Sequence, residues 1–150
     1  IRTSWLMGPF GKNFFTTNYK LHNSKDKIRV IKDQIGTPTS TLTLSKVCWK
    51  IVEEYSSENK IKSYLPSILH WCDKGMVSWY EIAVAIGKMG NQLGIIKEPA
   101  KVIPIDSNNY PAKALRPKYS ALDSSITSYF LNLPLISWKE ALKENLKLLI

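Results

Sequence analysis

The chain has 150 residues, of which 44% are hydrophobic and 11% aromatic, which is enough for one globular domain with its own core. It has no run of 18 apolar residues and does not begin like a signal peptide, so we expect a cytoplasmic protein with no membrane contact. The net charge of +9 comes from lysines and arginines without a basic block, which predicts solvated faces and no nucleic-acid partner.

The first third of the chain predicts two strands around one helix. An apolar run over residues 2–7 ends at a Gly-Pro loop, as a strand does, and residues 14–21 favour a helix. The β-branched run at residues 28–31 predicts a second strand. Residues 32–39, rich in turn formers, follow as a loop.

The middle of the chain predicts two helices separated by a strand. Apolar residues at three- and four-residue spacing predict the first helix, with Thr41 or Thr43 as its cap; they are Leu44, Val47, Cys48, Ile51, Val52 and Tyr55. A polar loop over residues 56–62 and an apolar strand over residues 67–72 come next.

The second helix of this region begins at a capping box, Ser78 with Glu81, in which each side chain binds the other's backbone N–H. Its buried stripe is predicted to be Ile82, Ala85, Ile86 and Met89. Gly90 and Gly94 are expected to end it.

The last third predicts a strand, a long loop and two helices. Residues 101–105 favour a strand that Pro104 places at an edge or a strand end, and residues 106–117 are irregular. A short extended piece at residues 119–122 and a helix at residues 124–131 follow. A second capping box, Ser137 with Glu140, opens a final helix whose apolar face contains Leu142, Leu146 and Leu149. The whole chain is therefore expected to be one mixed α/β domain.

The two cysteines, Cys48 and Cys72, each lie in an apolar pattern, which predicts two buried thiols rather than a disulfide framework. No pair of Cys or His has the spacing of metal ligands, so no metal site is expected.

The motifs of a complete nicotinamide enzyme are missing from this sequence. No G-x-G-x-x-G turn is present, and no Tyr is followed four residues later by Lys; Tyr110 and Lys113 are only three apart. We therefore expect no catalytic residue in the chain. Polar and aromatic residues in loops after strands are the candidates for ligand contact, and they are Trp5, Asn13, Gln34, Arg116 and Tyr119.

Six segments, in order, resemble the dTDP-4-dehydrorhamnose reductase family. They are RTSWLMGP (residues 2–9), GKNF (11–14), DQIGTPT (33–39), GMVSWYE (75–81), RPKYSALD (116–123) and WKEAL (138–142). The family usually has Tyr where this chain has Met7. The resemblance covers residues 1–150 and corresponds to the C-terminal half of such proteins.

The resemblance implies the C-terminal part of a Rossmann-type NAD(P)-binding fold with a small mixed α/β substrate-binding domain. Residues 1–7 would be a late Rossmann strand, and the N-terminal cofactor-binding half with its Tyr-Lys pair would precede them. Such enzymes use NADPH or NADH to reduce dTDP-4-dehydro-6-deoxy-L-mannose to dTDP-L-rhamnose, a precursor of polysaccharides. The chain alone is then expected to be inactive and to hold no cofactor. Its unpaired sheet edges would favour homo-oligomers.

The resemblance also assigns roles to individual residues. Trp5 would lie near the sugar, unless it is a core residue, and Asn13 would offer a polar group to the nucleotide. Arg116 would clamp a phosphate, unless it forms a surface ion pair. Thr3 and Ser4 would pass the nicotinamide, mainly with backbone contacts. Gln34, Thr39 and Tyr119 would contact substrate or shape their loops, whereas Trp79 and Trp138 are interpreted as architecture.

A second function stays open at this point. The same family includes a non-catalytic regulatory subunit of methionine adenosyltransferase, which shares the fold. The loop at residues 33–39 and the Arg116 motif resemble the bacterial reductases more closely, so a substrate-binding part of a reductase is the first hypothesis. The net charge allows a nucleic-acid partner as a third, with no motif to support it.

Overall fold

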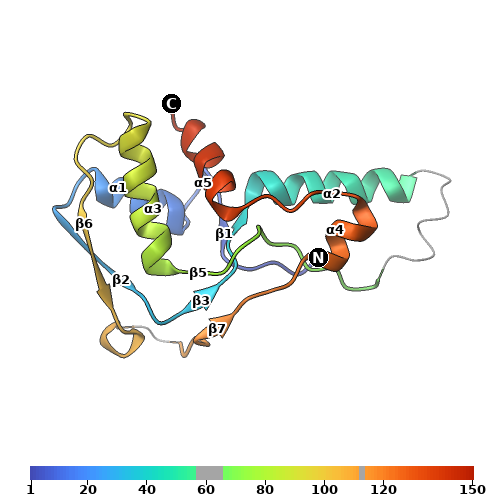
Figure 1. Cartoon of the computed structure of the whole chain (residues 1–150), viewed down its shortest axis with the longest axis horizontal. Coiled ribbons are helices and arrows are strands. Elements are labelled where there is room, and N and C mark those ends of the chain that lie inside the picture. The colour runs from blue at the N-terminus through green and yellow to red at the C-terminus, as the bar shows by residue number, and fades with distance from the viewer. Residues whose placement is uncertain (57–65, 112–113) are drawn as a thin grey trace.

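The helices and strands alternate along a mixed α/β chain, as the sequence predicts, and a computed structural model describes residues 1–56, 66–111 and 114–150 (Figure 1). The helices are α1 (Phe14–His22), α2 (Thr41–Ser56), α3 (Trp79–Gln92), α4 (Ser125–Leu131) and α5 (Trp138–Lys147), with one 3-10 turn, η2 (Ser107–Asn109). The strands are β1 (Leu6–Met7), β2 (Lys27–Ile31), β3 (Ile35–Gly36), β4 (Thr39–Ser40), β5 (Val77–Ser78), β6 (Lys101–Ile105) and β7 (Tyr119–Ser120).

The described strands pair in three small sheets. β2 and β6 are parallel along their whole lengths, and Pro104 lies opposite Val30. Since β6 pairs only with β2 in the described part of the chain, the predicted edge position of Pro104 is confirmed. β1 pairs with β4 in parallel, and β3 lies between antiparallel β5 and parallel β7.

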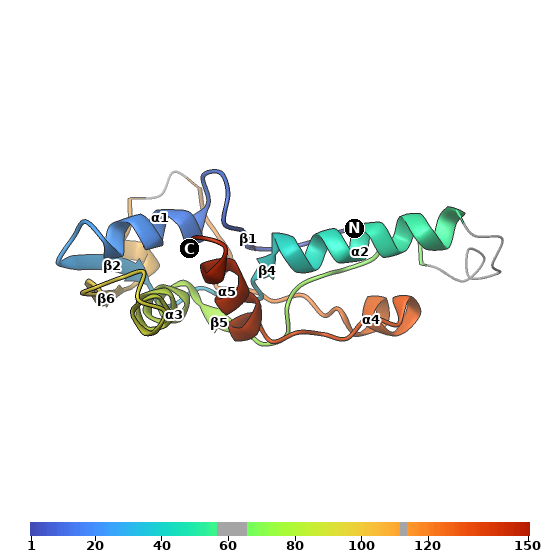
Figure 2. The same cartoon turned by 90° about the horizontal axis from the view of Figure 1, so that it is seen from above.

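The core is divided among three clusters of buried apolar side chains. The largest joins α1, α3 and α5, and its members are Met7, Phe15, Val77, Ile82, Ile86, Ile96, Leu142 and Leu146. A second lies between β2 and α3 and includes Ile28, Val30, Ala83 and Ala100. The third, with Val47, Trp71 and Leu131, joins α2 to α4. Figure 2 shows α2 running away from α1 and α3 with α4 beside it.

Side-chain caps fix where three helices begin. Both predicted capping boxes are confirmed, because Ser78 and Glu81 open α3 while Ser137 and Glu140 open α5. A third box, Asn13 with Thr16, opens α1 and was not predicted. Each such cap stabilises a helix by about 1 kcal/mol.

Two predicted strands are shorter than their apolar runs. In residues 2–7, Arg2 forms an isolated parallel bridge with His70 and only Leu6–Met7 is a named strand, because Trp5 has a left-handed backbone with φ 46°. That conformation breaks the extended run between them. Residues 67–72 are likewise not a strand in the structure. Their only β-pairing among the described residues is the isolated bridge of His70 with Arg2.

Other details of the predicted helices are wrong. Gly90 lies inside α3 under Ile96, and only Gly94, with φ +74°, follows the helix end. The hydroxyl of Ser40 accepts from the N–H of Leu42, so α2 begins after Ser40 and the two threonines proposed as its cap lie within it. Cys48 is exposed, unlike buried Cys72, because α2 turns another stripe inward. Most of the predicted loop at residues 56–62 lies outside the described residues.

Candidate functional site

A cavity of about 550 Å³ opens between α1, β2 and the residues that follow β6. This volume is in the range of small-molecule sites. Its lining is Phe14, Thr17, Asn18, Leu21, Ile28, Arg29, Val30, Ile31, Gln34, Trp79, Ser107, Asn108, Tyr110, Ala114, Leu115 and Arg116. The described lining therefore holds two arginines and no carboxylate, which suits an anionic ligand.

Asn18 lines this cavity and carries a buried acceptor that has no partner among the described residues. Its side chain is only 3% exposed, and its Nδ2 donates to the carbonyl of Phe14 at 2.9 Å. That bond fixes which end of the amide is nitrogen, and it leaves buried Oδ1 without a hydrogen-bond partner. A buried acceptor without a partner costs stability, so a ligand N–H donor would complete this site.

Gln34 brings a second buried amide to the cavity from the loop after β2. The residue is 6% exposed, and no described residue hydrogen bonds its side-chain amide. The backbone next to Gln34 is held by a strand hydrogen bond: the N–H of Ile35 donates to the carbonyl of Lys118 at 2.8 Å. The backbone is therefore fixed while both ends of the amide remain available for a ligand.

The two arginines of the cavity are both exposed and come from different elements. Arg29 lies on β2, and Arg116 lies near the end of the segment that follows η2. Neither guanidinium forms an ion pair with any described residue, so the surface pair considered for Arg116 is absent there. A guanidinium in this state offers paired N–H donors to phosphate or carboxylate oxygens.

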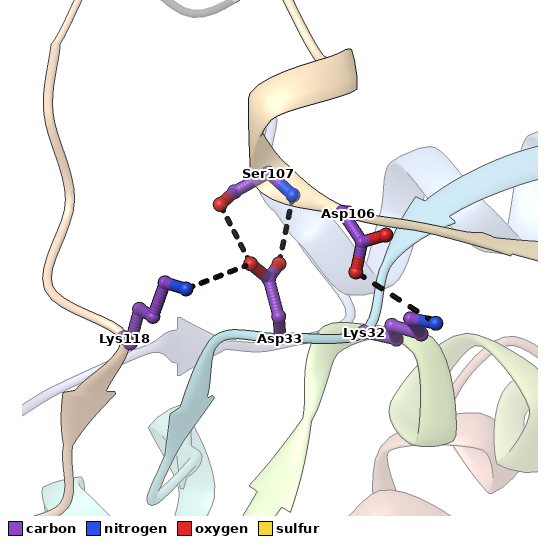
Figure 3. Close-up of polar contacts among 5 residues, drawn as sticks. All are labelled: Lys32, Asp33, Asp106, Ser107 and Lys118. Atoms are coloured by element: carbon purple, nitrogen blue, oxygen red, sulfur yellow. Dashed lines mark hydrogen bonds and ion pairs between the residues drawn. The ribbon is translucent and has the colours of Figure 1, made fainter.

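The carboxylate of Asp33 contacts both Ser107, which lines the cavity, and Lys118 (Figure 3). Its Oδ1 accepts from the N–H of Ser107 and its Oδ2 from the hydroxyl, each at 2.8 Å. The ammonium of Lys118 lies 3.9 Å from the same Oδ2. These hydrogen bonds from Ser107, with the nearby lysine charge, lower the pKa of Asp33. Lys32 and Asp106 form a separate exposed ion pair at 3.7 Å.

Trp5 lies against the wall of the cavity without lining it. Its indole stacks on that of Trp79, with ring centroids 3.7 Å apart and planes inclined by 13°. Trp79 lines the cavity and also packs against Phe14 at 4.5 Å. A bulky residue in the left-handed region costs about 1–2 kcal/mol, which the stack and the bond from Thr39 N–H to the Trp5 carbonyl offset.

The other predicted site residues are placed outside the cavity. Asn13 caps α1 and donates to the carbonyls of Gly8 and Phe10, so its amide is fully used by the protein. Tyr119 lies on β7 and donates its hydroxyl to the sulfur of Met76. Of the predicted site residues, Gln34 and Arg116 therefore line one cavity, Trp5 stacks on Trp79 outside the lining, and Asn13 caps α1.

The residues predicted to pass a nicotinamide pair with the loop at residues 37–39. The hydroxyl of Thr3 donates to that of Thr39 at 2.9 Å, and the hydroxyl of Ser4 donates to the carbonyl of Thr37 at 2.6 Å. With both hydroxyls used in this way, these residues would meet a cofactor through their backbone.

Sequence reasoning found Gln34 and Arg116 and missed the rest of the lining, of which Asn18, Arg29 and Trp79 matter most for a ligand. Asn18 stands on the predicted helix 14–21, four residues after Phe14, and Arg29 alternates with buried Ile28 and Val30 on the predicted strand. In each case the sequence shows only a polar residue on a helix or strand. Solvent-exposed faces give the same pattern, so it does not distinguish a ligand contact from a surface residue. Trp79 was predicted to have a structural role. It packs against Trp5 and Phe14, and it also lines the cavity.

Two classes of site find no support within residues 1–56, 66–111 and 114–150. No group of three or more His, Cys, Asp or Glu side chains there could hold a metal ion. No helix there is long and apolar enough to cross a membrane. The near-miss partner of Tyr110, Lys113, lies outside those ranges.

Comparison with known proteins identifies a family. A family model described as "RmlD substrate binding domain" matches residues 1–150. The spore coat polysaccharide biosynthesis protein SpsK of Bacillus subtilis is 35% identical over 98% of this chain and 46% of its own length. The chain thus spans about half the length of the curated relatives it matches.

Solved structures agree with that family. A crystal structure of a dTDP-4-dehydrorhamnose reductase from Clostridium acetobutylicum has a TM-score of 0.80 and 36% identity, covering 99% of this chain and 47% of its own. The enzyme of the same name from Bacillus anthracis, in complex with NADP, has a TM-score of 0.79 and 32% identity, covering 96% of this chain and 46% of its own.

Proposed function

Because the chain belongs to the RmlD substrate-binding domain family, we propose that it is the sugar-nucleotide-binding part of a dTDP-4-dehydrorhamnose reductase. Its ligand would be a dTDP-sugar, and the parent reaction would be the reduction of dTDP-4-dehydro-6-deoxy-L-mannose to dTDP-L-rhamnose. The regulatory-subunit alternative gains nothing from the relatives named above, which are reductases and a polysaccharide biosynthesis protein.

One observation carries the proposal: the cavity lining combines the Asn18 acceptor, which has no partner among the described residues, with two arginines that form no ion pair with any of them. Thymine has an N3–H donor between two carbonyl acceptors, so Asn18 Oδ1 would accept from N3–H while the Gln34 amide would meet a carbonyl. Arg116 would bind the diphosphate with paired N–H donors, and Arg29 would add positive charge. Phe14 and Trp79 give the base apolar walls.

The chemistry of the full enzyme would need groups that this sequence does not carry. NADPH or NADH, when bound, would supply the hydride, and Thr3 and Ser4 would lie beside it with backbone contacts, since their hydroxyls are bound to residues 37–39. The residues of this chain would bind and orient the sugar nucleotide. Holding a substrate in reactive geometry lowers a barrier by several kcal/mol. We therefore propose that the chain alone binds substrate and does not reduce it.

The setting of the protein follows from the same proposal. A precursor-forming reductase would work in the cytoplasm, with no nucleic-acid or membrane partner. Residues 1–7 would form a late Rossmann strand, and the edges of the small sheets would pair between copies when nothing else covers them. Light scattering that shows only monomers at millimolar concentration would contradict the last point.

Isothermal titration calorimetry of the chain with dTDP-L-rhamnose tests the central proposal. Binding is expected, with weaker binding of UDP-glucose and a loss of at least about tenfold in Arg116→Ala, which removes a phosphate contact worth about 1.5–3 kcal/mol. The matched control is Lys12→Ala, an exposed basic residue outside the cavity, which should bind as the unchanged chain does. No heat at millimolar dTDP-L-rhamnose would show that this chain does not hold the site.

A further inference from the structure

One face of α1 lines the cavity, with polar Asn18 between two apolar side chains. The lining residues of this helix have the spacing of a single helical face, and they are Phe14, Thr17, Asn18 and Leu21. Side chains three or four positions apart on a helix lie about 5–6 Å from each other, which is comparable to the width of a pyrimidine ring with its substituents. A base whose edge meets Asn18 therefore also reaches an apolar neighbour on this helix.

The cavity has an apolar end, which is made by Leu21 and Ile28. A short connection at residues 23–26 joins α1 to β2, so these two side chains lie near the same turn. Leu21 packs against the apolar cluster that contains Ile28. The backbone of Leu21 is fixed, because its carbonyl accepts from the N–H groups of Ser24 at 3.2 Å and Lys25 at 2.9 Å. The apolar end is thus formed by the fold itself.

The polar end of the cavity, made by Gln34 and Arg116, lies beyond the carboxyl end of β2. Gln34 follows that strand along the chain. Arg116 comes two residues before Lys118, whose carbonyl accepts from the N–H of Ile35 at 2.8 Å, so backbone pairing brings both polar side chains to this end. Ile28 is the second residue of β2 and lies near the opposite end of the strand. The cavity therefore extends along β2 from an apolar end to a polar, cationic one.

We propose that Leu21 and Ile28 form the pocket for the 5-methyl group of thymine and so determine a preference for thymine over uracil nucleotides. The inference rests on the proposed function, in which Asn18 Oδ1 accepts from thymine N3–H and Arg116 binds the diphosphate. In thymine the C2 carbonyl lies on the ribose side of N3–H, whereas the C4 carbonyl and the C5 methyl lie on the other side. With the diphosphate at the polar end, the C2 carbonyl meets Gln34 and the methyl group points to the apolar end.

The size of the expected preference follows from the burial of one methyl group. Removing a methyl group from water contributes about fourfold to affinity, which corresponds to ~0.8 kcal/mol, and a closely fitting apolar pocket contributes roughly tenfold. An apolar pocket discriminates only to this extent, because the smaller base leaves no buried polar group unpaired. We therefore expect dTDP to bind about four- to tenfold more tightly than dUDP, which differs from it by this methyl group alone.

Calorimetry with dTDP and dUDP tests the inference in the unchanged chain and in three variants. Leu21→Ala is expected to reduce the preference for dTDP to less than about twofold, mainly by weakening dTDP binding. Leu21→Met keeps a similar apolar volume and should retain most of the preference. Val102→Ala is the matched control, because Val102 is also partly buried against the cluster that contains Ile28 but does not line the cavity. It should keep the preference of the unchanged chain.

A second measurement needs no variant. Nuclear Overhauser effects from the thymine methyl protons of bound dTDP should connect to the methyl protons of Leu21 and Ile28. Equal affinity for dTDP and dUDP in the unchanged chain, or equal preferences in Leu21→Ala and Val102→Ala, would overturn the inference and leave the proposed function standing. If neither nucleotide binds, the proposed function is contradicted, and the inference with it.

Discussion

Ser107 donates both its backbone N–H and its hydroxyl to the carboxylate of Asp33, at 2.8 Å each (Figure 3). Asp33 follows β2 and Ser107 follows β6, so these two hydrogen bonds tie the carboxyl ends of the parallel pair together. Ligands of α/β proteins bind beyond the carboxyl ends of strands, and the cavity described here lies next to this tie.

The first prediction concerns this tie. Asp33→Asn replaces one accepting oxygen by an NH₂ group and removes the charge that faces Lys118, so Ser107 and the lining residues after it lose their anchor. We expect affinity for dTDP-L-rhamnose to fall about five- to tenfold, measured by calorimetry. Lys32→Ala breaks only the exposed pair with Asp106 and should change the affinity less than about twofold. Equal effects of the two variants would contradict the assigned role of Asp33.

The second prediction concerns the buried carboxylate of Asp73. The N–H of Ser40 and the hydroxyl of Thr43 donate to it at 2.8 and 2.6 Å, but burial is the larger effect and raises the pKa of Asp73 to about 6. A raised folded-state pKa means stability that is present below about pH 4 and lost as pH rises through about 6.

Asp73→Asn should therefore be more stable than the unchanged chain at pH 7 by about 1–3 kcal/mol, with the difference shrinking toward pH 4. Urea unfolding at several pH values measures it. Asp123 is a control in which the change in stability should have the opposite sign, because hydrogen bonds from Ser125 lower the pKa of its carboxylate. Asp123→Asn should lose stability at pH 7. A stability difference for Asp73→Asn that does not change between pH 4 and pH 7 would refute the assignment.

The third prediction separates binding from stability at Asn18. Asn18→Leu removes the buried acceptor that has no partner and keeps a similar volume, so the chain should be as stable or more stable, by up to about 1 kcal/mol. The same change should weaken dTDP binding at least about tenfold, because a donor on the ligand then meets an apolar group. Asn23→Leu, at the end of the same helix but outside the lining, should leave the affinity unchanged. An Asn18→Leu variant destabilised by more than the lost Nδ2 bond to the Phe14 carbonyl can account for, about 1 kcal/mol, would contradict the assignment of Oδ1 as an acceptor without a partner.

The fourth prediction concerns the contact of α1 with α3. His22 is 2% exposed, its Nε2 donates to the carbonyl of Ala83 at 2.9 Å, and burial lowers its pKa, so the ring is neutral. A Cβ on Gly87 would lie 2.6 Å from that ring. Gly87→Ala should cost about 1–3 kcal/mol by overpacking, although alanine favours a helix.

A double variant tests the cause of that loss. In the His22→Ala background the ring is gone, so Gly87→Ala should cost much less, or even stabilise α3. Thermal unfolding of the single and double variants gives the coupling. If the stability losses of the two single variants add in the double variant, the His22 ring is not what disfavours a side chain at residue 87.

Sequence patterns predicted those features that neighbouring residues determine. The two predicted capping boxes and the β-branched run of β2 depend on residues within one or two turns, and they were correct. The predicted burial of Cys48 was wrong, because α2 packs only part of its apolar surface against α4 and α5 and leaves Cys48 exposed. The contacts of the turn at Trp5 come from Thr39 and Trp79, more than thirty and seventy positions away, so no local pattern could indicate it.

The candidate site was predictable only in part, for the same reason. Gln34 and Arg116 were found because they lie in motifs after strands, and the family resemblance pointed to both. Asn18 and Arg29 belong to a helix and a strand whose patterns predict structure alone. Asn18 and Arg29 become lining residues only because α1 and β2 pack beside residues that follow β6, and this tertiary arrangement cannot be read from either local pattern.

The lining that this chain contributes to the cavity runs from residue 14 to residue 116, whereas the motifs for hydride chemistry are not in this sequence. Under the proposed function, the residues that bind the substrate and those that carry out hydride transfer would lie in separate stretches of sequence. A reductase could then acquire a new nucleotide preference by exchanging this stretch as one cassette, with its catalytic machinery left untouched. Chimeras in which two such sequences are joined ahead of Trp5 would test this division.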